Sequence, residues 1–136
     1  TQRSTLFPYT TLFRSYMRKY AQDVKAKGAT PILLSHIPRN MFTTKDSTNV
    51  IRNNDGLGKW TKEAAAMEKV PFIDLNQLIA DKYDKMGKTQ VPLMFYGDHT
   101  HTSLLGAQLN AKTMAEGIKA SKDKQLKKLK KALKKQ

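Results

Sequence analysis

Apolar residues recur along the chain in two alternating patterns: stretches with a helical apolar stripe, and short continuous apolar runs. Residues 16–28, "YMRKYAQDVKAKG", place Tyr16, Tyr20 and Val24 at helical spacing and end in Gly28, a common helix stop. The next run, "ATPILLSHIP", is short, aliphatic and bounded by proline, which is typical of a buried strand. The pattern predicts a helix that leads directly into a strand.

The same helix-then-strand unit repeats further along the chain. A polar, turn-rich segment without any period, residues 39–58, precedes a predicted helix over residues 59–69, and "VPFIDLN" is a second short apolar run. Because residues 39–58 are long for a simple connection, we expect a functional loop there. Helices that alternate with short buried strands imply parallel pairing in an α/β layered domain.

Two further helices complete the pattern. Residues 75–87 are amphipathic and stop at Gly87, and residues 104–120 follow Ser103, a favourable N-cap residue. We expect the buried face of the last helix to consist of Leu104, Leu105, Ala107, Leu109, Met114 and Ile118. Two or three strands do not make a covered parallel sheet by themselves. We therefore interpret residues 16–120 as the C-terminal half of a doubly wound α/β domain whose N-terminal half is missing.

The N-terminal residues do not continue this pattern. Residues 5–15, "TLFPYTTLFRS", resemble the in-frame translation of a common short-read sequencing adapter in all eleven residues. Polar residues interrupt the apolar run that a signal peptide needs, and Pro8 would fall in the middle of a strand. We interpret residues 1–15 as a non-native scar that belongs to no domain, and we expect it to make few buried contacts.

The net charge is concentrated at the C-terminal end. Of a formal charge of +14 at pH 7, residues 121–136 carry +7 through eight lysines and one aspartate, whereas residues 16–120 carry only +5. One helical face of this tail carries Leu126, Leu129 and Leu133. Such a tail is either a solvated extension or a basic amphipathic helix for an anionic surface. Because it has no arginine and no aromatic residue, we expect no specific nucleic-acid readout.

Several classes of site are not expected from this composition. There is no cysteine, so disulfides and cysteine-ligated zinc are excluded. With three histidines and no H-x-x-x-H spacing, we expect no metal site, and we interpret His36 as a strand-end residue that packs against the following loop. No apolar run approaches the length of a membrane span. Phe42 and Trp60 are either buried anchors or a platform for stacking sugars.

The motif with chemical content is "GDHTHTS", residues 97–103. Asp98 and His101 are three residues apart in a loop that enters a helix, so the carboxylate can hold one imidazole nitrogen and leave the other free to take a proton. The spacing alone is weak evidence, since an aspartate near a helix N-terminus also caps free amides beside an incidental histidine.

The longer segment "GDHTHTSLLGAQLNA" resembles the last sequence block of the SGNH (GDSL-like) hydrolases, in their rhamnogalacturonan acetylesterase-like branch. "GATPILLSHIPRNMF" and "VPFIDLNQLI" are similar to segments that precede that block. The resemblance implies that residues 16–120 are part of an SGNH hydrolase domain with a three-layer α/β/α, flavodoxin-like fold. It also implies that Asp98 is the orienting acid and His101 the general base, and it gives His99 no role. It also implies a cofactor-free esterase, exported in its intact form, whose partner is an acetylated polysaccharide or oligosaccharide of the pectin type.

The family's nucleophilic serine lies in a G-D-S block, and a Gly and an Asn from two further blocks complete its oxyanion hole. The sequence contains no G-D-S: Ser47 follows an aspartate preceded by lysine, and Ser103 is too close to His101 to approach it in line. We assign no nucleophile and expect this polypeptide alone to be inactive. The rival hypothesis is a non-catalytic basic module that binds a polyanion through its lysine tail. The sequence predicts no oligomeric state.

Overall fold

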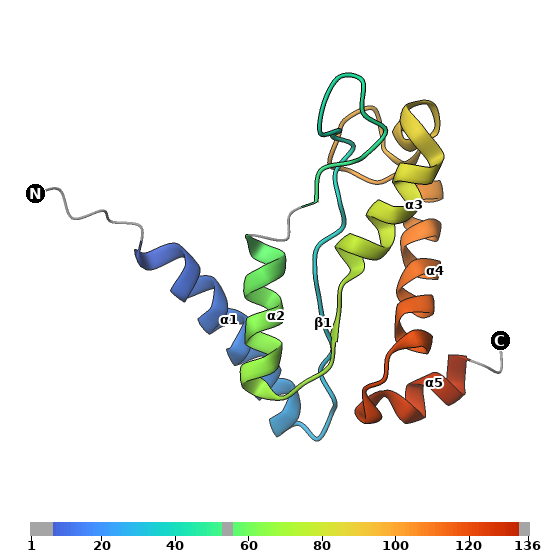
Figure 1. Ribbon diagram of the computed structural model, residues 1–136. Coiled ribbons are helices and arrows are strands. Elements are labelled where there is room, and N and C mark those ends of the chain that lie inside the picture. Colours follow the sequence, from blue (N-terminus) through green and yellow to red (C-terminus); the bar gives the residue numbers. More distant parts are fainter. Residues whose placement is uncertain (1–6, 53–55, 134–136) are drawn as a thin grey trace, which may run out of the picture.

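The computed structural model describes residues 7–52 and 56–133 (Figure 1). In chain order the elements are α1 (Phe7–Ala26), β1 (Leu33–Leu34), α2 (Leu57–Glu68), β2 (Phe72–Ile73), α3 (Leu75–Gln90), the 3₁₀ helix η1 (Val91–Met94), α4 (Leu104–Ala120), the 3₁₀ helix η2 (Lys124–Leu126) and α5 (Lys127–Leu133). Each helix and strand predicted from the pattern is present, and the strands are shorter than the apolar runs that contain them.

The two strands pair in parallel and are covered on both faces. Leu33 lies opposite Phe72 and Leu34 opposite Ile73. Since successive side chains of a strand point to opposite faces, Leu33 packs into a cluster with α1 and α2, whereas Ile73 packs with Ile118 of α4. Helices therefore lie on both sides of a parallel pair, as Figure 1 shows, which confirms the predicted α/β layering.

A third apolar cluster holds the segment after η1 against α3. Ile79 and Tyr83 of α3 are fully buried, together with Val91 of η1 and Val50 of the preceding long loop. The ring of Tyr83 meets the ring of Phe95 edge-on, with centroids 5.9 Å apart. This cluster fixes the start of the 97–103 loop to α3.

The buried face of α4 differs from the prediction. Leu104 and Leu105 are exposed at 68% and 51%, and Ala107 is exposed too, whereas Ile118 is buried and Leu109 and Met114 are partly buried. The reason lies at Gly106, where an added Cβ would lie 2.1 Å from the Met94 carbonyl oxygen. The helix thus approaches η1 through its glycine, and this turns the two leucines outward.

The first helix also differs, because it begins at Phe7 and not near Tyr16. Arg14 forms an ion pair with Glu63 of α2 (2.6 Å), and the Phe13 ring lies 6.0 Å from that of Trp60. No residue from 10 to 15 is buried, and residues 1–6 lie outside the described part of the chain. The scar interpretation stays a prediction.

The tyrosine face of α1 is exposed, and the helix packs through Ala21.

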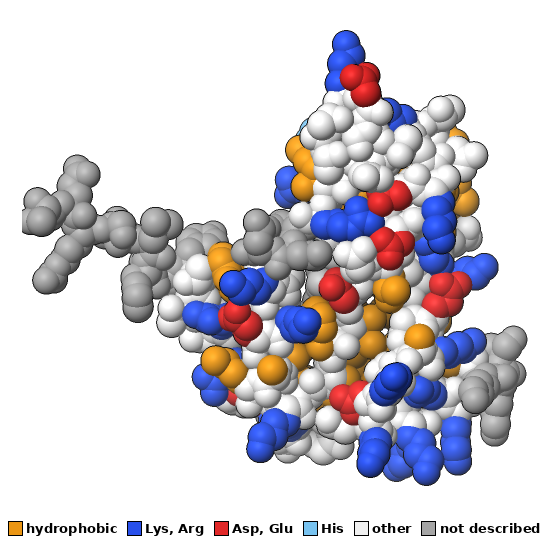
Figure 2. All heavy atoms as spheres, in the orientation of Figure 1, with side chains coloured by type: hydrophobic (Ala, Val, Ile, Leu, Met, Phe, Trp, Pro, Cys, Tyr) orange, Lys and Arg blue, Asp and Glu red, His pale blue; other side chains and the backbone are white. Residues whose placement is uncertain are grey.

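The lysine tail is partly built into the core, contrary to a purely solvated extension. Leu126 is 1% exposed and packs with Ile73 and Ile118, whereas Leu129 is 38% exposed. The Lys130 ammonium donates to the Ser121 carbonyl. Figure 2 shows basic side chains gathered over α5. In the described ranges, 7–52 and 56–133, no helix is both long and apolar enough to cross a membrane.

Candidate active site

The loop between η1 and α4 is closed on itself like a short hairpin. Phe95 and Thr102 form an antiparallel bridge, the Tyr96 N–H donates to the His101 carbonyl (2.9 Å), and the Ser103 N–H donates to the Met94 carbonyl (2.9 Å). Gly97 begins the turn at a φ of 78°, which side chains disfavour. The two ends of the loop are thus fixed, and its tip projects into solvent.

Asp98 and His101 are brought together at this tip. The Asp98 Oδ2 lies 2.6 Å from the His101 Nδ1, and its Oδ1 accepts the backbone N–H groups of Thr100 and His101 at 2.7 Å each. The hydrogen bond from the His101 ring, followed by the two backbone hydrogen bonds, holds the pKa of Asp98 well below its usual range. The carboxylate is therefore an acceptor at neutral pH, and it favours the tautomer with the proton on Nδ1.

This tautomer leaves Nε2 with a lone pair. The His101 side chain is 78% exposed, and Nε2 has no partner among the residues that the structure describes. An imidazole fixed in this way can accept a proton from a hydroxyl that approaches from outside and later return it. The arrangement is a base with its orienting acid.

The hydroxyls of Ser103 and Ser35 are committed to the fold. The Ser103 Oγ donates to the Leu93 carbonyl (2.8 Å) and accepts the Gly106 N–H, so it caps α4. The Ser35 Oγ donates to Asp74 (2.8 Å) and accepts the Asn76 N–H (2.8 Å). Neither hydroxyl is bonded to His101 in the described structure.

The remaining candidates from the sequence lie elsewhere. The His99 carbonyl accepts the Asn40 N–H (3.1 Å). The His99 side chain is exposed, and Asp98 pairs with His101 and not with His99. Trp60 lies against Phe13, whereas Phe42 lies under the Lys88 ammonium, 5.2 Å from the ring centroid. The two aromatic residues therefore form no common platform. Within the described residues, no group of three His, Asp or Glu side chains is placed to hold a metal ion.

A hollow of about 480 Å³ at the carboxyl ends of the two strands was not anticipated from the sequence. Its polar lining consists of His36, Arg39, Arg52 and Asn76. The Asn76 side chain donates to the His36 carbonyl (3.0 Å), so His36 does lie at the strand end beside the loop. Burial, followed by the charge of Arg39, lowers the pKa of His36, although Asp74 acts in the opposite direction. The sequence could have indicated this hollow, because residues that directly follow two parallel strands lie together at one edge of the sheet.

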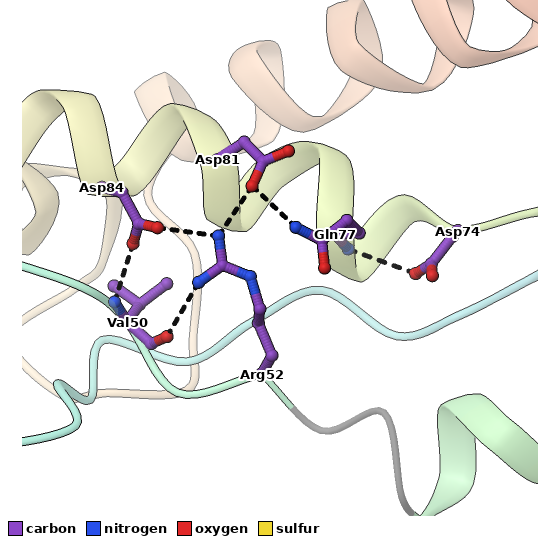
Figure 3. Close-up of polar contacts among 6 residues, drawn as sticks. All are labelled: Val50, Arg52, Asp74, Gln77, Asp81 and Asp84. Atoms are coloured by element: carbon purple, nitrogen blue, oxygen red, sulfur yellow. Dashed lines mark hydrogen bonds and ion pairs between the residues drawn. The ribbon is translucent and has the colours of Figure 1, made fainter.

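The long loop beside this hollow is clamped to α3 by a charged network (Figure 3). The Arg52 guanidinium donates to Asp81 and to Asp84, each at 2.7 Å, and the Val50 N–H donates to the second oxygen of Asp84 (2.8 Å). Both carboxylates raise the pKa of Arg52, led by the hydrogen bond to Asp84. Because the two oxygens of Asp84 bind the Val50 N–H and the Arg52 guanidinium, Asp84 fixes the direction of the loop backbone at these residues.

Comparisons with known proteins point to one family. No family model matches the chain. This chain is 31% identical over 119 residues to the probable rhamnogalacturonan acetylesterase YesY of Bacillus subtilis. It is also 29% identical over 128 residues to the rhamnogalacturonan acetylesterase RhgT of the same organism. Each alignment covers 82% of this chain but only 52% and 53% of the relatives, so the chain spans about half their length.

A solved structure agrees with these sequence matches. The crystal structure of the Bacillus subtilis protein YxiM superposes on 84% of this chain and 33% of its own, with a TM-score of 0.74 and 25% identity. Its fold is that of the SGNH hydrolases. The chain is therefore a homologue of the rhamnogalacturonan acetylesterases of the SGNH hydrolase family, and it has the α/β fold of that family.

Proposed function

We propose that this chain is part of a carbohydrate O-acetylesterase and supplies its acid–base pair, Asp98 and His101. The observation that carries the proposal is the 2.6 Å contact between the Asp98 Oδ2 and the His101 Nδ1, which leaves Nε2 available. The names of the two relatives support an acetylated rhamnogalacturonan, a pectin-type polysaccharide, as the substrate class.

In this proposal a serine hydroxyl attacks the acetyl carbonyl. The His101 Nε2 takes the hydroxyl proton, and Asp98 stabilises the imidazolium that forms. The imidazolium then returns the proton to the leaving sugar oxygen, and an acetyl-enzyme remains. Water, activated by the same imidazole, hydrolyses that ester. No step requires a cofactor.

The serine and the oxyanion donors are proposed to come from a part of the enzyme outside this chain. Two observations support this: the hydroxyls of Ser35 and Ser103 are bonded within the fold, and the sequence contains no G-D-S block. A base without a nucleophile within about 3 Å cannot transfer an acyl group. We therefore expect no turnover of an aryl acetate above background by residues 1–136 alone.

A chimera tests the proposal. The N-terminal half of RhgT is joined to residues 16–136, and hydrolysis of an aryl acetate is measured. We expect activity that falls by at least about a hundredfold in His101→Ala, because the serine loses its base. His99→Ala is the matched control and should retain most of the rate. Equal losses at the two histidines, or hydrolysis by the unmodified chain that does not depend on Asp98, would contradict the assignment.

A second function, polyanion binding by the lysine tail, has support from one observation. Leu126 anchors the tail to the core, so the lysines of α5 form a fixed basic surface. Affinity that depends on lysine contacts falls linearly with the logarithm of the salt concentration, whereas ester hydrolysis does not. A salt series of binding to a polyanion, compared between the full chain and Leu126→Ala, separates the two functions.

A further inference from the structure

A second hollow lies at the lysine-rich end of the molecule, where the chain passes from α4 to α5. It has a volume of about 640 Å³, and its lining consists of Lys122, Asp123, Lys124, Lys127, Lys130 and Lys131. Five lysines therefore surround one depression of the surface, which we call the basic hollow, and Figure 2 shows basic side chains gathered over this end. The proton transfer proposed above makes no use of these lysines.

The protein does not balance the positive charge of the basic hollow. Lys82 pairs with Glu116 on the neighbouring helices, but none of the five lysines of the hollow forms an ion pair within the described part of the chain. Asp123, the acidic residue in the lining, caps η2 by accepting the Gln125 N–H at its Oδ1 (2.8 Å). Because like charges at this spacing repel one another, a bound anion would stabilise this end of the molecule.

The backbone that carries these lysines is fixed in place. Leu126 is 1% exposed and anchors η2 in the core. The Lys130 ammonium donates to the Ser121 carbonyl, and the Gln125 side chain donates to the Lys69 carbonyl (3.1 Å). Binding at the basic hollow therefore requires no ordering of the backbone, which lowers its entropic cost.

The same packing argues against a membrane surface as the partner. A helix that lies on a bilayer inserts its apolar face. Here Leu126 and Leu133 pack against the core, and residues 121–136 contain no aromatic residue. A depression in the surface also fits a polymer chain better than a flat bilayer.

The lining indicates the chemistry of that polymer. An ammonium is a compact point charge that binds phosphate oxygens from many directions, whereas a planar carboxylate is matched by the arginine fork, which the lining of the basic hollow lacks. Five lysines around one depression also require closely spaced negative charges. A polyphosphate chain provides them, because each repeating unit of its thin, flexible backbone carries a charge.

We propose that the basic hollow binds a linear polyphosphate chain, with the ammonium groups of Lys124, Lys127 and Lys131 paired to its phosphate groups. The proposal rests on the polyanion binding proposed above as a second function, and it names the partner of that surface. Because the site loop lies at the opposite end of the molecule (Figure 1), the bound chain would hold the protein in place and leave the His101 Nε2 free.

Fluorescence anisotropy of a labelled polyphosphate, titrated with the full chain over a series of salt concentrations, tests the proposal. With three to five phosphate contacts, the logarithm of the binding constant should fall with that of the salt concentration with a slope of roughly −2 to −3.5, at about −0.7 for each contact of a single strand. The triple variant Lys124→Gln, Lys127→Gln, Lys131→Gln should flatten the slope by about 2 and lower the affinity at low salt at least about tenfold.

Three exposed lysines outside the basic hollow provide the matched control. The triple variant Lys45→Gln, Lys59→Gln, Lys85→Gln removes the same charge and should leave the slope nearly unchanged. If the two triple variants lose affinity equally, the proposal is overturned.

A comparison of polymers tests the proposal on the unmodified chain, without any variant. Poly-L-glutamate of the same charge number should bind at least about tenfold less tightly than polyphosphate, and vesicles of phosphatidylglycerol should bind less tightly per phosphate group. Equal binding of the glutamate polymer or of the vesicles would overturn the choice of polyphosphate alone. Absence of binding to either polymer would overturn the second function as well. None of these measurements involves Asp98 or His101.

Discussion

Asp98 accepts three hydrogen bonds from its own loop, two from backbone N–H groups and one from the His101 ring. All three partners lie within three residues, and a local contact of this kind is what the D-x-x-H spacing predicts. The residues that hold this loop in place lie in other elements. Tyr83 and Val91 hold its base from α3 and η1, and Gly106 lets α4 approach it closely.

We expect Gly106→Ala to destabilise the protein and displace the site loop. The new methyl group would meet the Met94 carbonyl oxygen at 2.1 Å, and backbone cannot move aside cheaply. Overpacking costs about 1–3 kcal/mol, which outweighs the gain of up to about 1 kcal/mol from alanine in a helix. Gly117→Ala is the matched control: its methyl meets only side-chain ends, of Leu78 and Ile73. Urea unfolding that shows a smaller loss for Gly106→Ala than for Gly117→Ala would contradict this account.

At the scale of elements, one carboxylate of α2 binds three side chains of α1. Glu68 accepts hydrogen bonds from Arg18 (2.7 Å), Gln22 (2.8 Å) and Lys25 (3.2 Å), and these lower the pKa of Glu68 to about 2, led by Arg18. An unfolded glutamate titrates near pH 4.3. The contribution of Glu68 to stability is therefore complete above about pH 4.3 and is lost as the pH falls towards 2.

This difference predicts a pH dependence that one substitution removes. Between about pH 5 and pH 2.5, the urea midpoint of the wild type should fall more steeply than that of Glu68→Gln, because the variant has no carboxylate to protonate. Asp46→Asn is the control, since the Asp46 side chain has no ion pair or hydrogen bond within the described structure. Parallel curves for the wild type and Glu68→Gln would show that the contact does not link the helices.

The C-terminal elements η2 and α5 are attached by Leu126. Leu126→Ala should cost about 2–5 kcal/mol of unfolding free energy, the usual range for a buried leucine. Leu129→Ala, at 38% exposure on the same helical face, should cost less than about 1 kcal/mol. Chemical denaturation of both variants checks this. Equal small effects would mean that the tail is a solvated extension after all.

At the scale of the whole molecule, the loops that form the site and the lysine-rich end lie at opposite ends (Figure 1). The alternating pattern was enough to predict helices, parallel strands and both covered faces. It could not predict which face of α4 is buried, because the contact depends on the shape of Gly106 against Met94 and not on hydrophobicity. The hollow was missed for a related reason: Arg39 and Asn76 are far apart in sequence and meet only through the strand pairing.

The central claim, that Asp98 prepares the His101 Nε2 to accept a proton, is tested most directly by the tautomer of His101. Long-range ¹H–¹⁵N NMR of the ring, at a pH at which the imidazole is neutral, reports which nitrogen carries the proton. We predict the proton on Nδ1 in the wild type and a shift of the population towards Nε2–H in Asp98→Asn, whose amide no longer requires a donor. A wild-type ring with its proton on Nε2, or a tautomer ratio that Asp98→Asn leaves unchanged, would contradict the account.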